Sequence, residues 1–114
     1  MQVIKIETHD EVFVDTFSTF KQGTIQAKRS QLEKAFKSPM TYLPEDGMKT
    51  STQWELKFTT PNGCFVATIY DWKRPQAPEQ NEMITWSIGG HYNIVVELVH
   101  QAFRRANKLA LQYA

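Results

Sequence analysis

Several features that would assign this sequence to a function class are scarce in it. There is one cysteine, Cys64, so no internal disulfide can form, and no positively charged leader followed by an apolar run opens the chain. No apolar stretch approaches the roughly 20 residues needed to cross a bilayer. We therefore expect a cytosolic protein that does not enter a membrane.

Charge of one sign is equally scarce. The formal net charge is +1 at pH 7. So small a charge creates no strong field, which argues against sequence-independent binding to nucleic acid. The three histidines, His9, His91 and His100, are scattered, and no CxxC pair or nucleotide-binding glycine motif is present. We therefore expect neither a metal site nor a resident cofactor.

Apolar residues, by contrast, are plentiful. They make up 41% of the 114 residues, enough for one packed core, so we expect a single domain over residues 1–114. Alternating apolar positions predict an α+β fold with an antiparallel sheet of about four to six strands. The predicted strands are Val3–Ile6, Val12–Val14, Thr24–Lys28, Gln53–Phe58, Cys64–Asp71 and Met83–Ile88.

Two helices are expected on one face of this sheet. Ser30–Glu33 has the capping-box pattern of a helix start, and that short helix must end near Ser38 because a proline follows. A broad apolar stripe predicts a longer helix from about Asn93 to about Leu111. The proline-containing segments Met40–Lys49 and Lys73–Gln80 are expected to be loops.

Strand parity decides which side chains face away from the helices. If Phe65 and Ile69 point toward the helices, Tyr70 and Trp72 must project from the other face. They would stand among polar side chains from neighbouring strands, namely Glu55, Lys57, Thr68, Thr85 and Ser87. Such a mixture suits a planar ligand. Alternatively, the two rings cover a sheet face that the N-terminal segment or a second copy of the chain already closes.

The pair Gly89-Gly90 stands between the last predicted strand and the long helix. It is expected either to form a tight turn with positive φ or to let backbone N–H groups approach an anion, with His91 beside it. Both interpretations stay open. The basic residues near the end of this helix, Arg104, Arg105 and Lys108, are expected in solvent, with an acidic partner as the alternative.

No catalytic arrangement emerges from the spacing of reactive side chains. Asp71 and Glu55 could act as an acid and a base, although nothing in their spacing requires it. Cys64 follows a turn at the start of a strand, which favours a small apolar filler over a nucleophile. We predict no catalytic residues, and a small hydrolase is a minor hypothesis.

Residues 23–103 resemble a group of small, mostly uncharacterised accessory proteins encoded by tailed bacteriophages. The segments that carry the resemblance are Thr24–Ala27, Gln31–Pro39, Gln53–Phe58, Val66–Lys73, Thr85–Gly90 and Val95–Phe103. The chain departs from the group at Lys37, where a glycine often precedes the Ser-Pro pair.

The resemblance implies an accessory protein that acts in the bacterial host cytoplasm and counters host defence. We expect a non-enzymatic, homo-oligomeric protein that sequesters a nucleotide-derived immune signal of the cyclic ADP-ribose or cyclic dinucleotide type. Tyr70 and Trp72 would stack on the base, Gly89, Gly90 and His91 would contact phosphate, and Lys57, Lys73 or Arg74 would neutralise charge, with Ser87 nearby. The alternative is a protein that inhibits a host enzyme by covering it.

Overall fold

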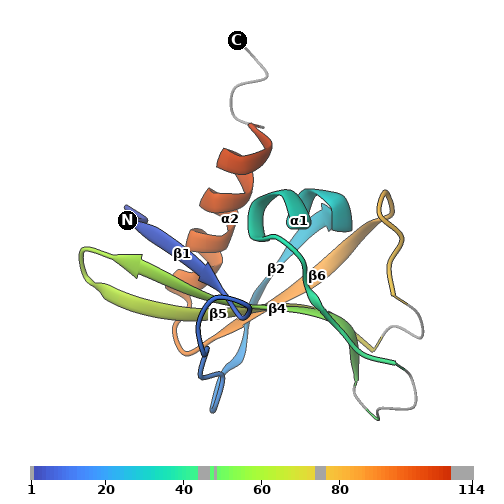
Figure 1. Cartoon of the computed structure of the whole chain (residues 1–114), viewed down its shortest axis with the longest axis horizontal. Helices are drawn as coiled ribbons and strands as arrows, with labels where there is room; N and C mark the ends of the chain where they lie inside the picture. Colours follow the sequence, from blue (N-terminus) through green and yellow to red (C-terminus); the bar gives the residue numbers. More distant parts are fainter. Residues whose placement is uncertain (1, 44–46, 48, 74–76, 109–114) are drawn as a thin grey trace.

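The computed structural model of the chain describes residues 2–43, 47, 49–73 and 77–108. Within these residues it has an antiparallel sheet and two helices, which confirms the predicted α+β class (Figure 1). The elements in chain order are β1 (Lys5–Thr8), β2 (Phe20–Lys28), α1 (Arg29–Phe36), β3 (Met40–Thr41), β4 (Thr50–Thr60), β5 (Gly63–Trp72), β6 (Met83–Gly90) and α2 (Ile94–Asn107).

The spatial order of the strands is β1-β4-β5-β6-β2, and β3 pairs with β4 on the edge that β1 also uses. The strongest predicted hairpin, β4–β5, is present, and its turn precedes Gly63. The φ of Gly63 is 118°, a backbone conformation that side-chain-bearing residues rarely adopt. The sequence therefore needs a glycine at this turn.

Alternate residues of the central strands build one core beneath the helices. Trp54 in β4 and Trp86 in β6 are fully buried and meet edge to face, with ring centroids 5.4 Å apart. Both helices cover this face of the sheet, and α2 passes behind the β4–β5 hairpin in Figure 1. The helices contribute the buried residues Leu32, Phe36, Val95, Leu98, Val99, Ala102 and Phe103. The opposite side of the sheet is here called the open face.

The segment Val12–Val14 is not a strand, contrary to the expectation from its β-branched residues. The backbone N–H groups of Glu11 and Val12 both donate to the carbonyl of Thr8, at 2.9 and 3.1 Å. The Glu11 carboxylate also accepts the N–H of Thr8 at 3.0 Å. This turn ends β1 and directs the chain away from the sheet, so local hydrogen bonding overrides β propensity.

Part of the predicted loop Met40–Lys49 is a strand, because β3 pairs with β4 through Met40 and Thr41. β4 itself begins at Thr50, three residues before the predicted start at Gln53. Thr and Ser residues continue the extended backbone there without adding an apolar alternation, so the pattern alone does not reveal it.

Both helices differ from their predicted limits at one end or both. α1 begins at Arg29, with Lys28 as its N-cap, whereas the predicted cap is Ser30. The side chain of Gln31 accepts the N–H of Lys28 at 3.0 Å, which sets this earlier start. α2 ends at Asn107 because Lys108 adopts a left-handed conformation with φ of 55°. The predicted end near Leu111 lies outside the described residues.

The residue after α1 has an unusual backbone. Lys37 has φ of 66° and ψ of −157°, a region that is essentially reserved for glycine. Its N–H donates to the carbonyl of Glu33 at 2.8 Å, and its carbonyl accepts the indole N–H of Trp54 at 2.8 Å. The core tryptophan thus holds the strained turn in place.

Candidate functional site

A pocket of about 260 Å³ opens on the open face of the sheet. Its floor is formed by Thr68 and Tyr70 of β5 and by Gly89 of β6. On one side it is bounded by Thr16 and Thr19, from the connection into β2, and by Phe20 at the start of β2; on the other side lie residues around the start of β4 and the end of β5. The N-terminal connection therefore covers part of the open face and leaves the rest accessible.

Tyr70 and Trp72 both line this pocket, on the face that strand parity assigns to them. Tyr70 pairs with Gln53 on one side and Ser87 on the other, while the neighbouring Ile69 is fully buried on the helix side. The Tyr70 and Trp72 rings meet edge to face, 6.1 Å apart at an interplanar angle of 77°. The Trp72 side chain has 52% of its surface exposed, so it is available to a ligand.

Burial also affects the protonation of the Tyr70 hydroxyl. Desolvation raises the pKa of the half-buried Tyr70 hydroxyl above 10.0, while its hydrogen bond with Ser87 acts in the opposite direction. Tyr70 therefore stays protonated at neutral pH and can donate a hydrogen bond. Ser87, a predicted site residue, pairs with Tyr70 in the sheet and is not among the pocket-lining residues.

Two ammonium groups lie near the exposed indole. Lys49 Nζ is 5.8 Å and Lys73 Nζ is 5.6 Å from the centroid of the Trp72 ring. A 2.7 Å hydrogen bond from the backbone N–H of Lys73 to the carbonyl of Lys49 holds the two residues together. In the described part of the chain neither lysine forms an ion pair with a carboxylate. The result is a positive region beside an aromatic ring.

A bulge in β4 brings Lys49 and Thr50 to this position. Between Thr50 and Gln53 the register of β4 against β5 shifts, so that three steps along β4 match two along β5. The Asp71 carboxylate, which is fully buried, accepts the N–H groups of Ser51 at 2.9 Å and Thr52 at 2.8 Å. It also accepts the Ser51 hydroxyl. Asp71 thereby satisfies the donors that the bulge removes from the ladder.

The bonding of Asp71 bears on the acid–base hypothesis. Because both of its oxygens accept hydrogen bonds from β4, this carboxylate acts as a structural cap. Glu55, the other candidate, accepts a hydrogen bond from the Gln53 amide at 3.0 Å. Cys64 is exposed beside the Thr59 hydroxyl, at 3.7 Å, so the expectation that it fills an apolar gap is wrong.

The glycine pair is not at a turn. Gly89 and Gly90 belong to β6, pair with β2 and β5, and neither has positive φ, so the tight-turn interpretation is wrong. α2 begins four residues after Gly90, which separates the glycines from the helix N-terminus. A Cβ on Gly89 would lie 2.5 Å from Thr68 Oγ1, whereas one on Gly90 would meet Val95 on the helix side. Both positions require glycine for close packing, and only Gly89 lines the pocket.

His91 and Lys57, two further predicted site residues, do not line the pocket. His91 is exposed, and its Nε2 lies 2.8 Å from the carbonyl of Phe17, which ties the N-terminal connection to the end of β6. Lys57 pairs with Glu7 and Val66 farther along β4 and is not among the pocket-lining residues. Arg74 lies outside the described residues.

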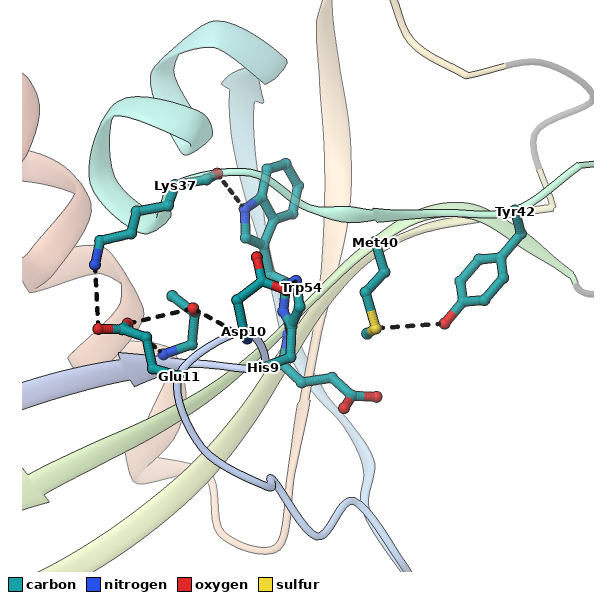
Figure 2. A network of polar contacts seen from close by, with 9 residues as sticks. His9, Asp10, Glu11, Lys37, Met40, Tyr42 and Trp54 are labelled. Carbon is teal, nitrogen blue, oxygen red and sulfur yellow. Dashed lines mark hydrogen bonds and ion pairs between the residues drawn. The ribbon is translucent and has the colours of Figure 1, made fainter.

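A polar network anchors the chain where it leaves β1 (Figure 2). His9 Nδ1 accepts the N–H of Glu55 at 3.3 Å, in the stretch of β4 between the parts paired with β1 and β3. Lys37 Nζ contacts the Glu11 carboxylate at 3.2 Å. Farther along, the hydroxyl of Tyr42 donates to Met40 Sδ at 3.9 Å, and burial raises the pKa of Tyr42. The contacts of His9 and Glu11 fix the start of the segment that leads to the pocket.

Sequence reasoning missed six of the ten described residues that line the pocket. Gln53 shares the parity of Glu55 and could have been assigned to the open face by extending β4 toward its start. Lys49 and Thr50 could not have been assigned in this way, because the bulge changes which face of the sheet the residues before it take. Thr16 and Thr19 come from an irregular connection whose path no periodicity predicts, and Phe20 begins β2 directly after it, four residues before the predicted start at Thr24.

No three His, Cys, Asp or Glu side chains of the described residues are grouped so that they could hold a metal ion. None of their helices is long and apolar enough to cross a membrane. No protein-family model, curated protein or solved structure matches the chain. The functional argument therefore rests on the pocket and on the residues around it.

Proposed function

We propose that this chain is a phage accessory protein that sequesters a small nucleotide-derived signal in the cytoplasm of the bacterial host. The observation that carries the proposal is the half-exposed Trp72 ring with the ammonium groups of Lys49 and Lys73 near it. An aromatic ring offers a stacking surface to a base, and unpaired ammonium groups attract phosphate.

The polar groups of the pocket support binding rather than catalysis. Tyr70 supplies a protonated hydroxyl, Gln53 an amide and Thr68 a hydroxyl, all of which can orient a heterocycle by hydrogen bonding. Asp71 lies behind them with both oxygens already bonded to β4. A protein with this arrangement holds its ligand and releases it unchanged.

The size of the pocket limits how much ligand one subunit encloses. Its volume of about 260 Å³ is below the range of roughly 300–1,000 Å³ typical of small-molecule sites. One nucleotide unit fits better than a whole cyclic dinucleotide or cyclic ADP-ribose. We therefore propose a homo-oligomer in which a second copy contacts the part of the ligand that projects from the first.

Calorimetry with a panel of cyclic dinucleotides, cyclic ADP-ribose and mononucleotides tests this proposal. Saturable binding of at least one compound is expected, and Trp72→Ala should weaken it about tenfold to a hundredfold, the contribution of one base–aromatic stack. Tyr92→Ala is the matched control, because Tyr92 is 64% exposed and contacts Phe65 instead of the pocket. No binding by any compound would contradict the proposal, and a modified ligand recovered after heat denaturation would indicate a hydrolase.

A second function is favoured by the aromatic residues beside the pocket. Phe13, Phe17 and Phe20, in and after the connection from β1, are 87%, 82% and 70% exposed. Exposed aromatic rings grouped in one segment are typical of protein-binding surfaces. The alternative is therefore an inhibitor that covers a host enzyme. Replacing Phe13 and Phe17 with Ser should then abolish co-purification of a host protein and leave nucleotide binding unchanged.

A further inference from the structure

The hydroxyl of Thr50 is buried and has no partner. Thr50 is 9% exposed, and its Oγ1 makes no hydrogen bond within the part of the chain that the structure describes. Buried polar groups in folded proteins are nearly always hydrogen-bonded, since an unmade bond costs the desolvation of the group. A hydroxyl without a partner beside a pocket indicates a group that is satisfied by something that enters the pocket.

The position of Thr50 is set by the bulge. Thr50 pairs with Trp72, and directly paired residues of antiparallel strands share a face. If β4 had no bulge, Thr50 would share the parity of Thr52 and Trp54, and its side chain would face the helices. The bulge instead places Thr50 on the open face, where it lines the pocket next to Lys49 in sequence and Trp72 across the sheet.

The charges nearby determine which chemical group would suit this hydroxyl. Lys49 and Lys73 carry the ammonium groups closest to the Trp72 ring, and both can only donate hydrogen bonds. A negatively charged group can accept hydrogen bonds from such donors and balance the lysine charges, whereas a neutral carbonyl or amine leaves those charges unbalanced. Phosphate fits because it offers several oxygens in different directions.

We propose that Thr50 is a specificity-determining residue whose hydroxyl donates to a phosphate oxygen of the ligand, at the end of the pocket where Lys49 and Lys73 lie near the Trp72 ring. The ligand class is then a nucleoside carrying a monophosphate or phosphodiester at this end of the pocket, and an unphosphorylated nucleoside binds more weakly. This inference rests on the nucleotide-binding function proposed above.

The test compares Thr50→Val and Thr50→Ser with the unmodified chain, using adenosine 5′-monophosphate, adenosine and inorganic phosphate as probes. Thr50→Val should weaken binding of the monophosphate about tenfold or more, as expected for a hydrogen bond to a charged group. Thr50→Ser should keep that affinity, and the weaker binding of adenosine should be the same in all three proteins.

A second measurement separates a ligand contact from a structural hydroxyl. Valine has the shape of threonine without the unpaired oxygen, so ligand-free Thr50→Val should unfold at an equal or higher urea concentration. The matched control is Thr60→Val, because the buried Thr60 hydroxyl donates to the carbonyl of Gly63 at 2.9 Å. Thr60→Val should unfold at lower urea and bind the monophosphate normally.

Three results would overturn the inference, and they are distinguishable. If Thr50→Val binds the monophosphate as tightly as the unmodified chain does, Thr50 is not the phosphate contact, while the nucleotide-binding function stands. If Thr50→Val unfolds at lower urea and Thr50→Ser does not, the hydroxyl has a structural partner. If the unmodified chain binds none of the probes, and no compound of the larger panel either, both the inference and the proposed function fail.

Discussion

The backbone N–H of Thr52 in β4 donates a 2.8 Å hydrogen bond to the buried carboxylate of Asp71 in β5. The same carboxylate also accepts from the neighbouring Ser51 N–H at 2.9 Å. The bulge that brings two pocket residues into place therefore depends on one side chain that does not touch the pocket. Asp71 is a positioning residue.

Replacing Asp71 with Ala should destabilise the protein by about 3 kcal/mol, because the Ser51 and Thr52 donors lose a charged acceptor in a buried place. Asp71→Asn should cost less, since one amide oxygen remains as an acceptor. Urea unfolding followed by circular dichroism measures both. Asp15→Ala is the control, because Asp15 caps the N–H of Phe17 in an exposed turn. Equal unfolding midpoints for Asp71→Ala and Asp15→Ala would contradict the role assigned to Asp71.

Lys37→Gly should stabilise the protein by about 1 kcal/mol. The strain of a side chain at φ of 66° and ψ of −157° is worth roughly 1–3 kcal/mol, and the ion pair with Glu11 that the change removes is exposed to solvent and contributes little. Lys34→Gly should have the opposite sign and cost about 1 kcal/mol, because Lys34 is exposed inside α1. Thermal unfolding of the two variants compares them, and equal destabilisation by both would show that Lys37 is unstrained.

Gly89→Ala should destabilise the protein by about 1–3 kcal/mol, because the new methyl group would lie 2.5 Å from Thr68 Oγ1. Most of this loss should disappear when Thr68→Ala is introduced as well, since the clashing atom is then absent. A double-mutant cycle by urea unfolding measures the coupling. Additive losses would indicate that Gly89 is required for its backbone instead of for the contact with Thr68.

Glu11 should make stability depend on pH in the acid range. Hydrogen bonding to Thr8, followed by the contact with Lys37, lowers the pKa of its carboxyl below the ordinary value of 4.5. A carboxyl whose pKa is lowered on folding stabilises the folded state above its unfolded pKa and loses that effect as pH falls through the folded pKa. The stability difference between the unmodified chain and Glu11→Gln should thus be present near neutral pH and shrink below 4.5. A difference that grows on acidification would contradict this assignment.

The sequence predicts the sheet well where one face is buried and the other is exposed. In β4, the alternation of Trp54, Leu56 and Phe58 with polar residues fixes both the strand and its orientation. The same rule places Tyr70 and Trp72 on the open face. Periodicity works here because burial selects every second residue.

The rest of the site depends on interactions that no period reveals. The Asp71 cap changes the parity of β4 and brings Thr50 and Lys49 to the pocket, but a lone Asp in a strand has no pattern that announces such a bond. The turn at Glu11 likewise converts the apolar Val12–Val14 run into a connection. The sequence predicts a turn at Gly89 and Gly90 because close side-chain packing and positive φ both require glycine, and the pattern does not distinguish the two causes.

The three tryptophans of the chain occupy two very different environments. Trp54 and Trp86 are fully buried against each other, whereas Trp72 stands half in water beside two ammonium groups. The buried pair therefore fluoresces from an apolar interior, which shifts its emission to the blue. Trp72 fluoresces from a hydrated surface, which shifts its emission to the red. The pocket carries its own fluorescent reporter: under the proposed function, a base that stacks on Trp72 should quench the red-shifted part of the emission, while the blue-shifted part records whether the core is intact.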